Sequence, residues 1–136
     1  MKGEFDTMTL KHDCIRDILI FCEKELTLDS NLTWVPIHLD VFCSSLTQYS
    51  HEDIVYTLYL LDEAGYIDSH IVEADGGILH IIVYRLTYSG HEFLDTIKSD
   101  NVWEKIKTAV ASVGSASLPV IQALGTECLI KCLTQT

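Results

Sequence analysis

Apolar positions recur every three or four residues in two early segments, which is the spacing of one face of an α-helix. The first segment is 10–25 and the second is 51–64. Ser50 precedes the second segment as an expected N-cap, and Gly65 follows it as an expected C-cap. Between the two helices, the sequence predicts a polar turn over 27–33, then a brief strand and a short helix.

Two strands are expected next, over 66–72 and 78–86, because the first alternates between apolar and polar residues and the second is rich in β-branched residues. The sequence Ala74-Asp75-Gly76-Gly77 between them is typical of a hairpin turn. Three further helices are predicted after the hairpin. The last, over about 117–133, is apolar almost all round.

This order of elements is that of a winged helix-turn-helix followed by extra helices. We therefore predict an α+β, mostly helical fold. One domain, 1–136, would contain a winged helix-turn-helix core over about 9–87 and a C-terminal helical extension over about 88–134, with a possible role in dimerisation.

Charge changes the functional expectation for this fold. The net charge is −11, and no lysine or arginine occurs between Lys24 and Arg85. Ten acidic residues lie in that interval: Glu25, Asp29, Asp40, Glu52, Asp53, Asp62, Glu63, Asp68, Glu73 and Asp75. Nucleic-acid affinity rests largely on basic groups that neutralise phosphates. In a winged helix-turn-helix the helix over 51–64 would be the recognition helix, and we expect no DNA contact through it.

The outward side of that helix carries tyrosines between acidic residues, at intervals of four, three and four. Tyrosine is enriched at protein interfaces, and the tip of the predicted wing is acidic as well. The expected protein interface is therefore Glu52, Tyr56, Tyr59, Glu63, Glu73 and Asp75. The alternative is a solvated acidic face whose tyrosines pack partly against the neighbouring helix.

The apolar last helix needs burial on more than one side. We expect it to pair with a second copy of the chain, which would make a homodimer. The expected dimer interface is Leu118, Ile121, Leu124, Cys128, Leu129 and Cys132. In the alternative, the helix packs back across the first helix of its own chain.

The sequence contains no strong catalytic motif. Gly90-His91-Glu92-Phe93 resembles a catalytic segment, but neighbouring helical residues point apart and no HExxH motif is present. We expect Gly90 to allow close packing, His91 to make a structural hydrogen bond, and Phe93 and Leu94 to fill the core. No nucleophile or phosphate-loop motif occurs either. The chain is therefore predicted to be non-enzymatic, with no cofactor.

The five cysteines do not form a recognisable metal or disulfide pattern. An odd number of cysteines, with no CxxC pair, argues against a disulfide framework and against zinc. We expect buried apolar thiols and no metal site. The chain shows no export signal and no apolar run long enough to span a bilayer, so a cytoplasmic protein is expected, without membrane contact.

Three motifs over roughly residues 50–124 resemble a known family. They are Leu60-Leu61-Asp62-Glu63-Ala64-Gly65-Tyr66-Ile67, then Leu86-Thr87-Tyr88-Ser89-Gly90-His91-Glu92-Phe93-Leu94-Asp95, and Val102-Trp103-Glu104-Lys105-Ile106-Lys107 followed by Gly114. The family is a domain-of-unknown-function group of small proteins, often found in bacterial prophages and mobile elements. The resemblance implies a winged-helix core and a phage link, and it implies no activity.

The leading functional hypothesis is a phage- or mobile-element-associated protein that binds a protein partner through its acidic surface. It would act as an inhibitor or decoy of a basic, nucleic-acid-binding host or defence protein. The first alternative is a DNA-binding transcriptional regulator whose scattered basic residues form a patch: Lys2, Lys11, Arg16, Lys24, Arg85, Lys98, Lys105 and Lys107. The second alternative is a simple dimerisation module.

Overall fold

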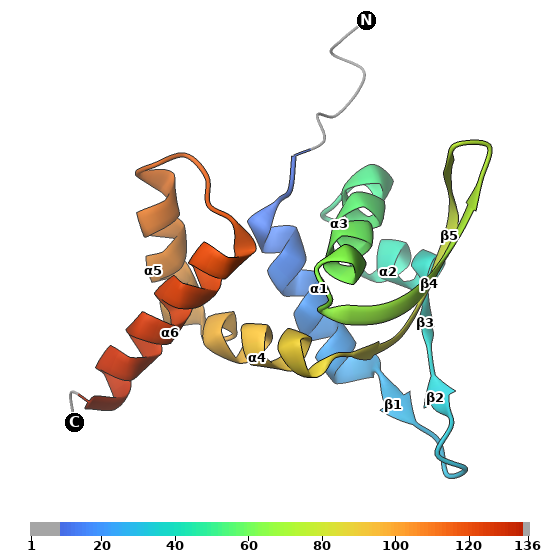
Figure 1. Cartoon of the computed structure of the whole chain (residues 1–136), viewed down its shortest axis with the longest axis horizontal. Helices are drawn as coiled ribbons and strands as arrows, with labels where there is room; N and C mark the ends of the chain where they lie inside the picture. Colours follow the sequence, from blue (N-terminus) through green and yellow to red (C-terminus); the bar gives the residue numbers. More distant parts are fainter. Residues whose placement is uncertain (1–8, 135–136) are drawn as a thin grey trace, which may run out of the picture. The chain divides into compact units, whose positions relative to one another are not determined.

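The computed structural model describes residues 9–134, and within them the chain forms six helices and five strands (Figure 1). The chain divides into two compact units, Met1–His91 (unit 1) and Glu92–Thr136 (unit 2). The fold is mixed α+β with helices in the majority, as the sequence predicts.

Unit 1 contains three helices whose apolar faces form its core. They are α1 (His12–Glu25), α2 (Leu39–Ser45) and α3 (His51–Glu63). The predicted caps of α3 are confirmed. The Ser50 hydroxyl accepts a hydrogen bond from the Asp53 backbone N–H at 3.1 Å, and Gly65 follows the helix with a positive φ of 82°. The left-handed backbone at Gly65 ends the helix, and glycine adopts this conformation without the strain that a side chain would cause.

A three-stranded antiparallel sheet completes unit 1. Its strands are β3 (Ile37–His38), β4 (Ile67–Ala74) and β5 (Gly77–Leu86), in the order β3-β5-β4. The predicted hairpin turn between β4 and β5 is confirmed, with positive φ at Asp75 and Gly76. The long β4–β5 hairpin extends beyond the helices of unit 1 (Figure 1).

The segment predicted as a polar turn is part of a second, smaller sheet. In it β1 (Thr27–Leu28) pairs with β2 (Trp34–Val35), and Pro36 then separates β2 from β3. Two-residue strands carry no detectable alternation, so the sequence pattern missed this pairing. A proline cannot donate to a strand ladder, which is why the single predicted strand is split in two.

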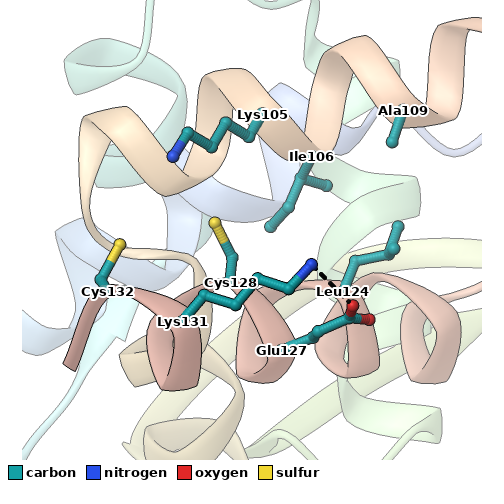
Figure 2. Close-up of a pocket in the computed structure, with 8 residues that line it drawn as sticks. All are labelled: Lys105, Ile106, Ala109, Leu124, Glu127, Cys128, Lys131 and Cys132. Atoms are coloured by element: carbon teal, nitrogen blue, oxygen red, sulfur yellow. Dashed lines mark ion pairs between the residues drawn. The ribbon is translucent and has the colours of Figure 1, made fainter. Parts of the chain in front are cut away.

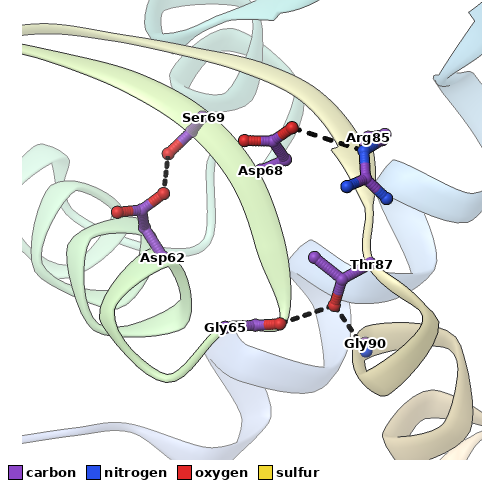
Figure 3. A network of polar contacts seen from close by, with 7 residues as sticks. All are labelled: Asp62, Gly65, Asp68, Ser69, Arg85, Thr87 and Gly90. Atoms are coloured by element: carbon purple, nitrogen blue, oxygen red, sulfur yellow. Dashed lines mark hydrogen bonds and ion pairs between the residues drawn. The ribbon is translucent and has the colours of Figure 1, made fainter.

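Thr87 joins the end of α3 to the start of α4 (Figure 3). Its hydroxyl donates to the Gly65 carbonyl at 2.5 Å and accepts from the Gly90 N–H at 3.0 Å. Gly90 is buried, and a Cβ there would clash with the Tyr66 carbonyl oxygen. The expectation that Gly90 allows close packing is confirmed, and this junction fixes the start of α4 against the connection between α3 and β4.

Unit 2 is helical. Helix α4 (Tyr88–Ile97) crosses the boundary between the units and is followed by α5 (Asp100–Ala111) and α6 (Leu118–Thr134). Phe93 and Leu94 are buried, as expected. The expected structural hydrogen bond of His91 is wrong: its ring is exposed and makes no hydrogen bond within residues 9–134.

No helix between residues 9 and 134 is both long enough and apolar enough to cross a lipid bilayer.

Candidate functional site

The outward stripe of α3 is placed as its spacing predicts. Ile54, Leu58 and Leu61 are fully buried on the inner side of the helix, and Glu52 and Glu63 are exposed. The two tyrosines of the stripe, Tyr56 and Tyr59, are half-buried. The stripe therefore offers two exposed carboxylates and two partly accessible aromatic rings. This arrangement is intermediate between a protein interface with exposed tyrosines and a solvated acidic face with packed tyrosines.

The tip of the β4–β5 hairpin adds two exposed acidic residues, Glu73 and Asp75. Asp75 lies in the turn itself, and Glu73 lies on β4 opposite Ile78. Neither residue forms an ion pair within the described part of the chain, and the same holds for Glu52 and Glu63. We call these six side chains, Glu52, Tyr56, Tyr59, Glu63, Glu73 and Asp75, the acidic surface.

Other acidic residues of the same interval have structural partners. Asp53 accepts from the Lys11 ammonium at 2.7 Å, and Asp68 pairs with the Arg85 guanidinium at 3.3 Å. Asp62 accepts from the Ser69 hydroxyl at 2.7 Å (Figure 3). These contacts stabilise unit 1, whereas no ion pair among the described residues offsets the carboxylates of the acidic surface.

The basic residues of unit 1 are separated along α1 or already paired. Lys11 precedes α1 and Lys24 lies in its last turn, so a rise of 1.5 Å per residue places them about 20 Å apart. Lys11 and Arg85 pair with carboxylates, which reduces the charge they offer to a phosphate. Lys98, Lys105 and Lys107 belong to unit 2, and Lys2 lies outside the described residues.

The thiols of α1 are unsuited to nucleophilic or metal chemistry. Cys14 and Cys22 have no exposed surface. Burial raises the pKa of Cys14, and it raises the pKa of Cys22 to about 12, so both thiols stay protonated at neutral pH. Among residues 9–134, no three His, Cys, Asp or Glu side chains converge as a metal site would require.

One polar pair had no signal in the sequence. Nδ1 of His38 and Nε2 of His80 lie 3.0 Å apart, and the two rings stack with centroids 5.2 Å apart. His38 pairs with Ile82 across β3 and β5, which brings its ring beside His80 two residues away. The two histidines are 42 positions apart in sequence, so only the strand register reveals this contact.

The six residues expected at a dimer interface differ in exposure, from buried to exposed at Cys132, and the interface stays a prediction. Leu118 and Ile121 are buried within the chain. Leu124, Cys128 and Cys132 line a cavity of about 320 Å³ beside Ile106 of α5 (Figure 2), and Leu129 is half-buried. Cys132 is exposed, and the large exposed apolar residues of α6 are Val120, Ile130 and Leu133.

Comparison with known proteins places the chain in a family. The model of a hypothetical-protein family, DUF2513, matches residues 9–117. An uncharacterized protein of Haemophilus influenzae is 32% identical over 100 residues, which cover 74% of this chain and 76% of that protein. No solved structure matches the chain. With a family model that spans most of its length, this chain belongs to the DUF2513 family of hypothetical proteins.

Proposed function

We propose that this chain is a non-enzymatic, cytoplasmic winged-helix protein that binds another protein through its acidic surface. The order of α1, α2, α3 and the β4–β5 hairpin supports a winged-helix core, with α3 as its recognition helix and the hairpin as its wing. The observation that carries the proposal is that Glu52, Glu63, Glu73 and Asp75 are exposed without an ion pair in the described residues.

The charge of the acidic surface selects a basic partner. Its carboxylates would occupy positions that phosphates take on a nucleic-acid-binding protein, and the long-range field would speed the encounter. Tyr56 and Tyr59 would supply apolar contact area beside the charges. The chain would thus act as an inhibitor or decoy of a nucleic-acid-binding host or defence protein, in keeping with the phage link implied by its motifs.

A capture experiment with matched charge variants tests this proposal. We would immobilise the wild-type chain, the double variant Glu52→Gln with Glu63→Gln, and a control with Glu92→Gln and Asp95→Asn. Glu92 and Asp95 are exposed in unit 2, so both variants lose the same charge. Proteins retained from a bacterial lysate at low salt should be lost on the α3 variant and kept on the control.

Those retained proteins should also be displaced by duplex DNA, because the decoy occupies their nucleic-acid site. Equal retention by all three chains, or retention that duplex DNA does not affect, would contradict the proposal.

We also propose that α6 makes a homodimer through its exposed apolar residues. Val120, Ile130 and Leu133 are all at least half exposed on this helix. A second copy would cover these side chains by a two-fold, self-complementary contact.

A further inference from the structure

The β1–β2 hairpin exposes apolar side chains that the acidic surface does not use. Leu28 pairs directly with Trp34 across the two strands, so the two side chains lie on the same face. Trp34 is 47% exposed, and Leu32 at the tip is 79% exposed. The hairpin projects from unit 1 as a separate arm (Figure 1). Contiguous exposed apolar residues on a small arm are typical of a contact surface.

The tip of this hairpin is fixed rather than loose. One carboxylate oxygen of Asp29 accepts from the backbone N–H groups of Asn31 and Thr33, at 2.8 and 3.0 Å. The Leu32 N–H donates to the Asp29 carbonyl at 2.9 Å. This turn holds Leu32 at a φ of 61°, a conformation that leucine rarely adopts. A strained, exposed leucine in a well-bonded turn points to a functional position.

A small cavity adjoins the hairpin inside unit 1. Its volume is about 240 Å³, and its apolar walls come from Leu26, Leu28, Trp34, Tyr84 and Leu86. Small-molecule sites usually measure roughly 300–1,000 Å³, so this cavity is better matched to one apolar side chain. Two aromatic walls would give that side chain a large contact area.

The charged residues around the cavity indicate which kind of partner it would bind. Glu23 and Arg85 line it, and both have partners within the chain, which for Arg85 is Asp68. Glu25 and Asp29 flank β1 and are exposed, against the single charge of Lys24. The local balance is therefore negative, which favours a basic group beside the apolar anchor.

We propose that the β1–β2 hairpin and its cavity bind a segment of a partner protein in which an apolar side chain lies next to a lysine or arginine. The apolar side chain enters the cavity between Trp34 and Tyr84. The basic side chain lies at the rim near the exposed carboxylates of Glu25 and Asp29, and Leu32 packs against the backbone that follows. This site is separate in its residues from the acidic surface and does not depend on the proposed decoy function.

A random-peptide library displayed on phage tests this proposal with the purified full-length chain. We expect enriched peptides that share an apolar residue beside lysine or arginine. A synthetic peptide of that consensus should bind at least about tenfold more weakly to the Trp34→Ser and Leu32→Gly variants, which is the scale of losing one anchoring side chain. The control Leu79→Ser, which removes from β5 a leucine whose exposure lies between those of Trp34 and Leu32, should leave the affinity unchanged.

The Leu32→Gly variant separates binding from folding, because glycine adopts a positive φ more readily than leucine. Weaker peptide binding by a variant that unfolds no earlier than the wild type supports the proposal. Three results would overturn it. The enriched peptides could share an acidic consensus, or the wild-type chain could enrich no peptides beyond those that the Trp34→Ser variant enriches. The consensus peptide could also bind both hairpin variants as tightly as the wild type. Self-association lost on Trp34→Ser would also overturn it, because a second copy would then be the occupant.

Discussion

At the scale of single residues, burial decides which side chains can ionise. Cys22 lies on the inner face of α1 with no exposed surface, and its thiol pKa is raised from 9.0 to about 12. The folded chain therefore holds this proton more tightly than the unfolded chain does. The resulting stabilisation is fully present below pH 9 and is lost as the pH rises from about 9 towards 12.

We predict that the free energy of unfolding falls with pH in this alkaline window. At pH 10 the Cys22 thiol alone should account for a loss of about 1.4 kcal/mol relative to neutral pH. Urea unfolding at pH 8 and pH 10 measures the loss, and the Cys22→Ala variant should lose less by that amount. An equal loss in the wild type and the variant would show that the buried thiol does not titrate as described.

Gly90 shows how one missing side chain positions two elements. A Cβ at this position would overlap the Tyr66 carbonyl oxygen, and backbone cannot move aside as a flexible side chain would. Gly90→Ala should therefore destabilise the chain by about 2 kcal/mol or more, at the upper end of overpacking costs. Urea denaturation checks this value against Gly77→Ala, where nothing lies within 4 Å and the change should stay within about 0.5 kcal/mol. Similar stabilities for the two variants would refute the close approach.

At the scale of elements, periodicity and local capping could be read from the sequence. The inner faces of α1 and α3, the Ser50 cap and the β4–β5 turn all depend on residues close together in the chain, and all are confirmed. The β1–β2 pairing and the His38–His80 contact depend on strand register between distant segments. No local pattern encodes that register, so neither was predicted.

The face of α6 that packs inward could not be predicted for a related reason. A helix that is apolar almost all round gives no stripe to distinguish its sides. The structure turns Leu118 and Ile121 inward and leaves Ile130 and Leu133 exposed. Packing within the chain thus removes Leu118 and Ile121 from solvent, while dimerisation and the rest of the expected contact stay predictions.

We predict that the exposed face of α6 determines the oligomeric state. The wild-type chain should sediment as a dimer, and the double variant Ile130→Ser with Leu133→Ser should sediment as a monomer, because it loses the apolar contact area. Val113→Ser is the matched control, since Val113 is equally exposed but lies after α5. A monomeric wild type, or a double variant that stays dimeric, would contradict this interface.

At the scale of the whole molecule, charge distribution separates the proposed function from the usual role of a winged helix. The net charge is −11, and the interval from Lys24 to Arg85, which contains α3 and almost all of the hairpin, holds no other basic residue. Phosphate binding would therefore require groups elsewhere, and the Lys11 and Arg85 charges are already paired. A field of this sign favours basic proteins and disfavours nucleic acid.

The most direct measurement is an anisotropy titration of fluorescent mixed-sequence duplex DNA with the purified full-length chain, at low and at moderate salt. We predict no binding at either salt concentration, because the surface of α3 and the hairpin tip repels phosphate. Micromolar binding at low salt with a steep loss on added salt would contradict this. It would mean that the scattered lysines and arginines form a patch that binds DNA despite the acidic surface.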